Sequence, residues 1–321
     1  MIIEELRYAY FGSGVFAARC LELLSEWRMP SWVVTSHVGA SRGRNARVRS
    51  PVGELVTSGA GAWRGIPLVE SASASSDEAV LELKKNVLVD FAFVVDFGQF
   101  IREPLLDYNG RIGCLNIHPS GLPRYRGAAP IQRALMDGAE DIGVSIFKLG
   151  RGMDSGPLLI QEKLAVAPFE DFGSVSERAA VLGVEAFIGL VSKTSVREWN
   201  FLPQDEALAT YAPKISSGEE RIDWRMTASA ISNRVRAFSP RPGAWTTLRG
   251  KRLLILSARP IEGNPENGAQ PGELRLGGGN PSVVSSDGFV ELITVQPEGK
   301  KPLPASAWKN GLRMCAKECL K

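Results

Sequence analysis

The sequence is poor in the residues from which metal centres and disulfide frameworks are built. Its 321 residues include only four cysteines and two histidines. The cysteines are Cys20, Cys114, Cys315 and Cys319, and they lack the paired spacing of zinc sites. We therefore expect unlinked thiols in a reducing cytoplasm, and no metal site.

Long apolar runs are also absent. No stretch of about 18 apolar residues occurs, so we expect no transmembrane helix. The first residues, MIIEELRYAYFG, carry acids before any base and no cleavable apolar block, unlike a signal peptide. These absences predict a cytoplasmic protein that does not bind a membrane.

The composition is that of a globular protein with a sizeable core, because 44% of the residues are hydrophobic and 23% are charged. The net charge of +3 is unevenly distributed. From Asp205 onward the chain has 17 Lys and Arg against 12 Asp and Glu, whereas acids outnumber bases before that point. A basic C-terminal third favours a polyanionic partner such as RNA, and a merely solvated surface explains it equally well.

Apolar stretches alternate with amphipathic segments through about the first 200 residues. We expect a strand and tight turn at 6–14 and strands at 31–36, 66–70, 89–98, 113–120 and 142–150. Helices are expected between them, at 15–27, 51–60, 75–85 and 129–138, and after them at 174–193. This alternation predicts an α/β fold with a Rossmann-like, doubly wound, mostly parallel sheet.

The pattern changes near residue 200. The segment EWNFLPQDEALATYAPK, 198–214, has the composition of a linker, and the strands beyond it are shorter and separated by frequent turns. Such spacing is typical of a small antiparallel barrel. We therefore expect a catalytic domain at 1–204 and a small OB-like β-barrel domain at 205–321.

Asn116 and His118 end the apolar stretch CLNIHPS. Ligands of open α/β sheets bind beyond the carboxyl ends of the strands, and residues two apart on a strand face the same side. A carboxamide and an imidazole placed together can hold an oxyanion and move a proton, as acyl transfer requires. Such residues are also common turn-formers or satisfied polar groups, and the pair alone leaves both interpretations open.

Asp154 lies in KLGRGMDSGPLL, a Gly-rich loop that follows another expected strand. An Asp before Ser-Gly often only closes a turn. If the two strand ends adjoin, however, its carboxylate can orient the His118 imidazole. Asn116, His118 and Asp154 would then form a coherent site for acyl transfer.

The stretch NIHPSGLPRYRGAAPIQRAL, followed by GVSIFKLGRGMDSGPLL, resembles the folate-dependent formyltransferases. Similar stretches, such as YFGSGVFAARCLELL, SPVGELV and YAPKISSGEERIDW, extend the resemblance over most of the chain. It implies 10-formyltetrahydrofolate as formyl donor, and it is strongest to the members that formylate the α-amine of methionyl-initiator tRNA. The family's catalytic residues fall on Asn116, His118 and Asp154.

The resemblance also implies where the folate binds, with ordinary core and turn packing as the alternative. The pterin is expected beside the strand that ends VVDFGQFI, where Asp96 stands in place of the more usual Ala, and against the loop before Asp154. The implied contacts are Phe97, Gly98, Gln99, Phe100, Ile101, Leu149, Gly150, Arg151 and Gly152, with Ser120, Gly121, Leu122 and Pro123 in the loop behind His118.

Four arginines, Arg42, Arg44, Arg47 and Arg49, lie in a basic loop that aligns with a family insertion reaching the tRNA acceptor end. Arginines there can neutralise phosphates, although a solvated loop is the alternative. Arg124 and Arg126 either contact the acceptor stem or lie on the surface.

Two other functions remain open from the sequence. One is a formyltransferase for another amine, such as a UDP-amino-sugar, and the other is a catalytically inactive RNA-binding relative. We expect a monomer.

Overall fold

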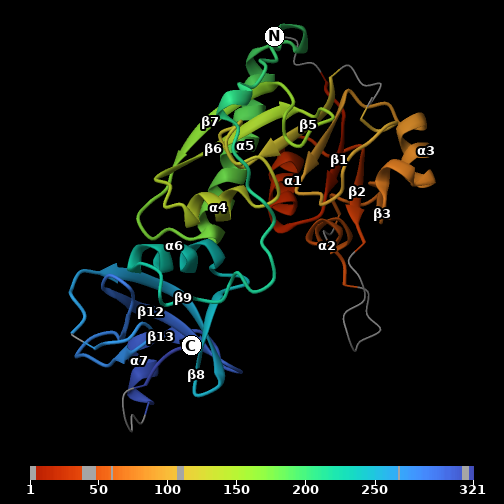
Figure 1. Cartoon of the computed structure of the whole chain (residues 1–321). Coiled ribbons are helices and arrows are strands. Elements are labelled where there is room, and N and C mark those ends of the chain that lie inside the picture. Colours follow the sequence, from red (N-terminus) through yellow and green to blue (C-terminus); the bar gives the residue numbers. More distant parts are fainter. Residues whose placement is uncertain (1–4, 38–47, 59–60, 107–111, 267, 313–317) are drawn as a thin grey trace. The chain divides into compact units, whose positions relative to one another are not determined.

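The computed structural model describes residues 5–37, 48–58, 61–106, 112–266, 268–312 and 318–321 (Figure 1). The chain forms two compact units. The first comprises Met1–Ala128, Gly143–Leu164 and Ser176–Pro213, and the second comprises Ala129–Ile142, Ala165–Val175 and Lys214–Lys321. Residues 205–213, which we expected in the C-terminal domain, therefore pack with the first unit.

A seven-stranded sheet organises the first unit. Its order is β3-β2-β1-β4-β5-β6-β7. The pairs among β1 to β5 are parallel, whereas β5 and β6 are antiparallel. The strands are β1 (Tyr8–Gly12), β2 (Trp32–Ser36), β3 (Leu68–Ser71), β4 (Phe91–Val95), β5 (Gly113–His118), β6 (Asp141–Lys148) and β7 (Leu158–Ala165).

Helices cover both faces of this sheet because alternate side chains of its central strands point to opposite sides. On one face, Phe93 of β4 packs edge-to-face against Phe187 of α5 with ring centroids 4.8 Å apart. On the other, Val94 shares a buried cluster with Val80 of α3. The doubly wound prediction is thus confirmed. The helices of this unit are α1 (Val15–Trp27), α2 (Pro51–Ser58), α3 (Glu78–Asn86) and α5 (Phe172–Lys193), with short 3₁₀ turns η1 (Ala74–Ser76), η2 (Val196–Glu198) and η3 (Glu206–Leu208), whereas α4 (Pro130–Met136) belongs to the second unit.

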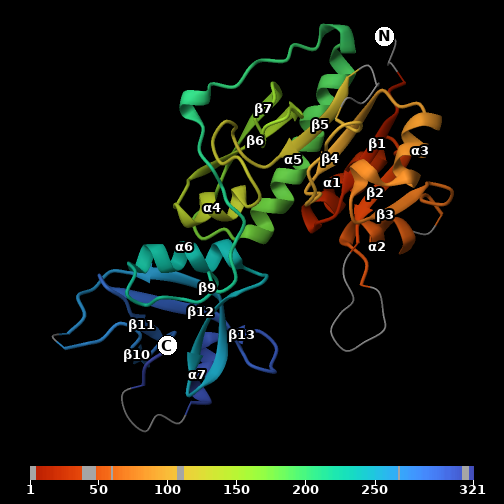
Figure 2. The same cartoon turned by 45° about the vertical axis from the view of Figure 1, so that its right-hand side comes forward.

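The second unit is built on an antiparallel sheet of order β10-β11-β12-β9-β8, with β13 paired to β12. Helix α6 (Ala228–Phe238) lies across β9 and β12 (Figure 2). The other elements are β8 (Ala244–Leu248), β9 (Lys251–Ile261), β10 (Leu274–Arg275), β11 (Ser282–Val284), β12 (Phe289–Pro297), β13 (Leu303–Pro304) and α7 (Ala305–Asn310).

The C-terminal residues join the two outer strands of this sheet. Thr247 of β8 exchanges backbone hydrogen bonds of 2.8 and 3.0 Å with Lys321, and the Leu274 N–H of β10 donates to Glu318 O at 2.8 Å. The sheet thereby closes on itself, as an OB-like barrel requires. The expected antiparallel β domain is confirmed.

The elements that we did not expect include β7, α6, β13 and α7. The described cysteines, Cys20, Cys114 and Cys319, are free thiols. Within the described ranges, no helix is both long and apolar enough to cross a membrane.

Candidate active site

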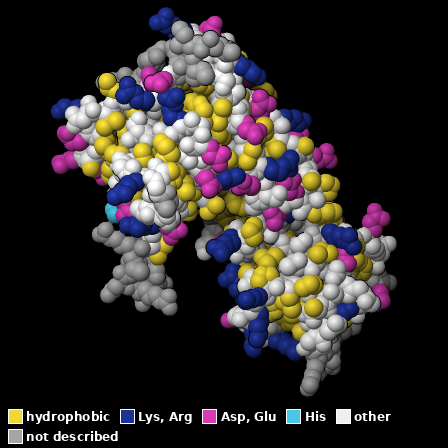
Figure 3. Space-filling model, turned by 180° about the vertical axis from the view of Figure 1, so that it is seen from behind, with side chains coloured by type: hydrophobic (Ala, Val, Ile, Leu, Met, Phe, Trp, Pro, Cys, Tyr) yellow, Lys and Arg dark blue, Asp and Glu magenta, His cyan; other side chains and the backbone are white. Residues whose placement is uncertain are grey.

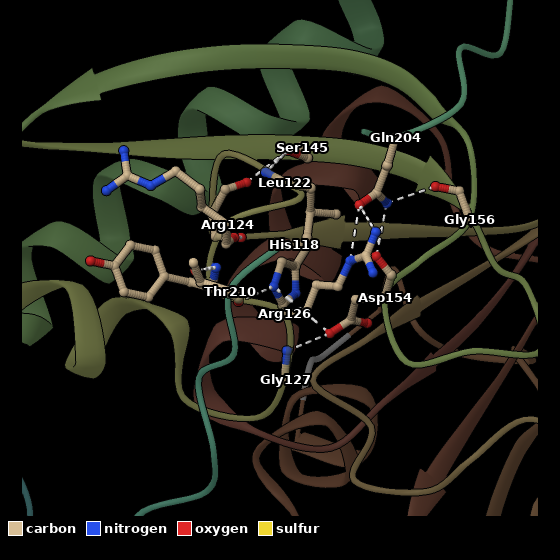
Figure 4. A network of polar contacts seen from close by, with 12 residues as sticks. His118, Leu122, Arg124, Arg126, Gly127, Ser145, Asp154, Gly156, Gln204 and Thr210 are labelled. Atoms are coloured by element: carbon tan, nitrogen blue, oxygen red, sulfur yellow. Dashed lines mark hydrogen bonds and ion pairs between the residues drawn. The ribbon is translucent and has the colours of Figure 1, made fainter. Parts of the chain in front are cut away.

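His118 is the last residue of β5 and is 5% exposed. Its Nε2 lies 3.1 Å from the main-chain carbonyl oxygen of Tyr125 (Figure 4). A carbonyl oxygen only accepts hydrogen bonds, so Nε2 carries the hydrogen. The ring of Phe147, on the neighbouring strand β6, meets the imidazole edge-to-face at 6.3 Å. The imidazole is therefore held in one orientation by packing on one side and a hydrogen bond on another.

Asp154 approaches the same nitrogen. Its Oδ2 lies 3.9 Å from His118 Nε2 and accepts a 2.8 Å hydrogen bond from the Gly127 N–H. The 3.9 Å separation is too long for a hydrogen bond but suits an ion pair with a protonated imidazole. Both side chains are largely withdrawn from water, at 7% and 16% exposure. The structure therefore brings together two of the three predicted catalytic residues.

The route by which Asp154 reaches His118 differs from the one we expected. We expected the end of β6 to adjoin the end of β5, but the strands are antiparallel, with His118 opposite Ser145 and Leu115 opposite Lys148. The loop that carries Asp154 therefore starts at the far end of β5 and has to fold back towards His118. The expectation of adjoining strand ends was wrong, although the resulting proximity is present.

Asn116 shares β5 with His118, two residues earlier, and therefore the same face of the sheet. Every other residue of β5 is buried, whereas Asn116 is half-buried. Its carboxamide can consequently reach a bound molecule beside the imidazole. The strand thus supplies two of the predicted groups without any contribution from loops.

The predicted residues behind His118 form a tightly bonded turn. The Ser120 hydroxyl donates to Arg124 O at 2.8 Å, and Ser120 O accepts from the Ser145 hydroxyl at 2.7 Å. The Leu122 N–H donates to the same Ser145 hydroxyl at 3.1 Å. Ser120 and Leu122 are buried, while Gly121 and Pro123 are half-buried. The polar groups of Ser120 and Leu122 are therefore engaged within the protein.

The predicted folate residues divide between core and surface. Phe97 belongs to the buried cluster of the α3 face, and Ile101 and Leu149 pack against that cluster, so both predicted segments border one apolar region. Gln99 instead donates to Ser36 Oγ and Ser71 O and accepts from the Ala74 N–H, which ties strand ends together. Exposed residues of the two segments are Gly98, Phe100, Arg151 and Gly152, with Gly150 half-buried.

Asp96 follows β4 directly and adopts a φ of +40°. Its carboxylate lies against the start of α1, so closely that a Cβ on Gly14 would fall 1.7 Å from Asp96 Oδ2. Burial raises the pKa of Asp96 to about 6, against the lowering effect of a hydrogen bond from the Ala17 backbone. Part of the residue nevertheless remains exposed at the protein surface.

Of the four predicted tRNA-binding arginines, only Arg49 is among the described residues; Arg42, Arg44 and Arg47 lie outside them. Arg49 Nε is 3.3 Å from Glu70 Oε1, and its Nη1 is 3.4 Å from Thr57 Oγ1. About half of its side chain remains exposed.

Arg126 is buried, so the expectation of a surface or acceptor-stem contact was wrong for this residue. Its side chain is 2% exposed and its guanidinium makes two hydrogen bonds to the Glu206 carboxylate. Two more go to Gln204, whose carboxamide contacts the Asp154 loop. Sequence reasoning missed Gln204 and Glu206 because they lie in a segment with the composition of a linker, where no periodicity singles them out.

Among the described residues, no three His, Cys, Asp or Glu side chains lie closely enough together to hold a metal ion.

The class of protein follows from the similarity of this chain to known families. Residues 7–191 match the formyl transferase family, and residues 214–313 match the C-terminal domain of formyl transferases. The chain therefore belongs to the formyl transferase family.

Full-length relatives narrow this assignment. The methionyl-tRNA formyltransferase of Dictyoglomus turgidum is 35% identical over 314 residues, which cover 96% of this chain and 97% of the relative. Within the formyl transferases, the chain belongs with the methionyl-tRNA formyltransferases.

Solved structures share the fold at lower identity. WlaRD, a sugar 3N-formyl transferase, matches with a TM-score of 0.61 at 15% identity, over 92% of this chain and 99% of its own. HypX from Aquifex aeolicus in complex with tetrahydrofolic acid matches with a TM-score of 0.56 at 18% identity. That match covers 98% of this chain and 51% of HypX, so this chain spans about half the length of HypX.

Proposed function

We propose that Asn116, His118 and Asp154 transfer the formyl group of 10-formyltetrahydrofolate to the α-amine of methionyl-initiator tRNA. The observation that supports this most directly is the meeting of His118 and Asp154 at 3.9 Å, beside an accessible Asn116 on the same strand. An imidazole, a carboxylate and a carboxamide are together sufficient for acyl transfer without a covalent enzyme intermediate.

In the proposed reaction, the α-amine of the methionyl group attacks the formyl carbon and forms a C–N bond. The formyl carbonyl becomes an oxyanion, which the Asn116 carboxamide and the protonated His118 imidazole stabilise. Asp154 balances the charge of the imidazolium. The bond from the formyl carbon to N10 of the folate then breaks, and N10 takes up a proton while the former amine loses one. The products are formyl-methionyl-tRNA and tetrahydrofolate.

The proposed folate site uses the apolar region bordered by Phe97, Ile101 and Leu149. Exposed main chain lies beside it at Gly98, where a φ of +74° favours glycine and leaves the backbone uncovered. A flat pterin ring needs this combination of apolar side chains and accessible peptide groups. The residues of both segments thus fit the donor that the family implies.

The proposed tRNA contacts include the second unit as well as the loop of Arg42, Arg44, Arg47 and Arg49. Lys and Arg side chains gather along one margin of this unit (Figure 3). Within it, the guanidinium groups of Arg252 and Arg221 lie 4.6 and 5.6 Å from the ring centroid of Trp245. An aromatic ring flanked by two cations offers a stacking surface and phosphate neutralisation at one place.

The testing experiment incubates the purified protein with 10-formyltetrahydrofolate and either methionyl-initiator tRNA or a UDP-amino-sugar. We expect formyl transfer to the tRNA only, and a loss of about 100-fold or more in kcat for His118→Ala, the usual cost of a group that stabilises an oxyanion. Transfer to the sugar alone would overturn the assignment. A His118→Ala variant within about threefold of wild type would overturn the mechanism.

A further inference from the structure

The carboxamide of Gln204 uses its full hydrogen-bonding capacity on three neighbouring residues (Figure 4). Its Nε2 donates to Asp154 O at 2.8 Å and to Gly156 O at 2.7 Å. Its Oε1 accepts from Arg126 Nε at 3.1 Å and from Arg126 Nη2 at 2.7 Å. A carboxamide has two N–H donors and two acceptor positions, so all four are occupied.

Arg126 fixes which way this carboxamide faces. A guanidinium only donates, so the Gln204 oxygen must point towards Arg126 and the amino group towards the two carbonyls. Arg126 is itself anchored, because Glu206 accepts from its Nη1 and Nη2 at 2.8 and 2.7 Å. Its main chain is paired as well, through an N–H bond to Thr210 O at 2.8 Å and an Ala212 N–H bond to its carbonyl at 2.7 Å. The donor pair that faces the Asp154 loop is thus rigidly oriented.

Asp154 needs such support. Its φ of +48° lies in the left-handed region, which is strained for a residue with a side chain. Gly127, the residue after Arg126, donates its N–H to the Asp154 carboxylate at 2.8 Å. Two consecutive residues therefore hold Asp154 at both ends, Gly127 through the side chain and Arg126, by way of Gln204, through the main chain.

We propose that Gln204 and Arg126 are positioning residues for catalysis: they hold the Asp154 loop so that its carboxylate faces His118. The inference rests on the proposed function, in which Asp154 balances the charge of the imidazolium. Neither residue touches a reacting atom in this proposal. Their effect is on the chemical step, because a displacement of about 1 Å at a catalytic group can cost about 100-fold in rate.

Gln204→Glu tests this with almost no change of shape. The carboxylate keeps an acceptor oxygen for Arg126. Its second oxygen replaces the amino group that faces Asp154 O and Gly156 O, and it repels both carbonyl oxygens. We expect kcat to fall at least tenfold, while KM for folate and for tRNA stays within about threefold. Gln270→Glu, the same change at an exposed residue of the second unit, is the matched control and should leave both constants unchanged.

Arg126→Lys supplies the second measurement. A single ammonium cannot reproduce the fork that joins Gln204 and Glu206, so we expect kcat to fall. The loss should be smaller than the loss for Gln204→Glu. If both residues act through one contact, the double variant should be no slower than Gln204→Glu alone. Losses that multiply would contradict a shared pathway.

The assays are run well below the melting temperature of each variant, so that a merely structural role predicts no change in kcat. The inference is overturned if folded Gln204→Glu retains kcat within about threefold of wild type while His118→Ala is inactive. If His118→Ala is active as well, the proposed function itself has failed, so the two failures are distinguishable.

Discussion

Asp154→Asn removes one charge from the proposed site and changes little else. The carboxamide keeps an oxygen that can accept from the Gly127 N–H, now 2.8 Å from Asp154 Oδ2, so the loop retains its anchor. What is lost is the negative charge 3.9 Å from His118 Nε2. The substitution therefore isolates the electrostatic contribution of the carboxylate.

The size of that contribution follows from Coulomb's law. Two unit charges about 4 Å apart interact by about 4 kcal/mol at an effective dielectric constant near 20. Salt screens this pair weakly because both side chains are at most 16% exposed. If the imidazolium forms in the transition state, 4 kcal/mol corresponds to about a thousandfold in rate. Solvent that reorganises around the Asn recovers part of this, so we expect kcat to fall between about 100-fold and 1000-fold.

Single-turnover kinetics with saturating folate and methionyl-tRNA measure the chemical step directly. The control is Asp77→Asn, because Asp77 caps α3 with its carboxylate and Asn is an equally good cap. The control should keep the wild-type rate. A loss of less than about tenfold for Asp154→Asn would refute the assigned role, since an ion pair at this distance could then not form in the transition state.

Two further predictions concern other parts of the chain. The pKa of Asp96 is raised to about 6 in the folded protein, so ionising it costs stability as the pH rises from about 4 to about 6. Asp96→Asn should therefore gain stability relative to wild type over that interval in urea unfolding, and an equal difference at pH 4 and pH 7 would contradict the burial of the carboxylate. In the second unit, Trp245→Ala and Arg252→Ala should each raise KM for tRNA and leave kcat unchanged. Arg252→Ala should also reduce the salt slope of tRNA binding by about one, and an unchanged slope would exclude a phosphate contact there.

The sheet could be predicted from the sequence where its strands are buried. β1 and β4 are buried along their whole length, and their apolar residues mark them without reference to anything else. β7 was not predicted because it is an outer strand whose residues are mostly half-buried or exposed. Leu158–Ala165 therefore shows neither a continuous apolar run nor a strict alternation. The boundary of the first unit was not predicted for a related reason. Residues 205–213 are held by polar contacts, which leave no apolar pattern in the sequence.

The candidate site divides along the same line. Asn116 and His118 lie two apart on one strand, and that spacing alone predicts that they share a face. The ion pair between the buried Arg126 and the exposed Glu206 joins residues 80 positions apart, a distance over which local patterns carry no information. Arg126 therefore looked like a surface arginine beside Arg124 in the sequence, although its surroundings in the fold are entirely different.

The antiparallel pairing of β5 and β6 explains why the site needs a support of this kind. Parallel strands would have delivered Asp154 to the same sheet edge as His118, with the strand itself fixing its position. Because β6 is antiparallel to β5, it ends beside Leu115 rather than beside His118. Asp154 therefore reaches His118 from a loop, and it does so in a strained backbone conformation. A loop is not held by the backbone hydrogen bonds that pair strands. The position of Asp154 therefore depends on its neighbours Gly127, Gln204 and Arg126. Substitutions in β5 should thus remove a reacting group, whereas substitutions in this support should leave every reacting group in place and only displace one of them.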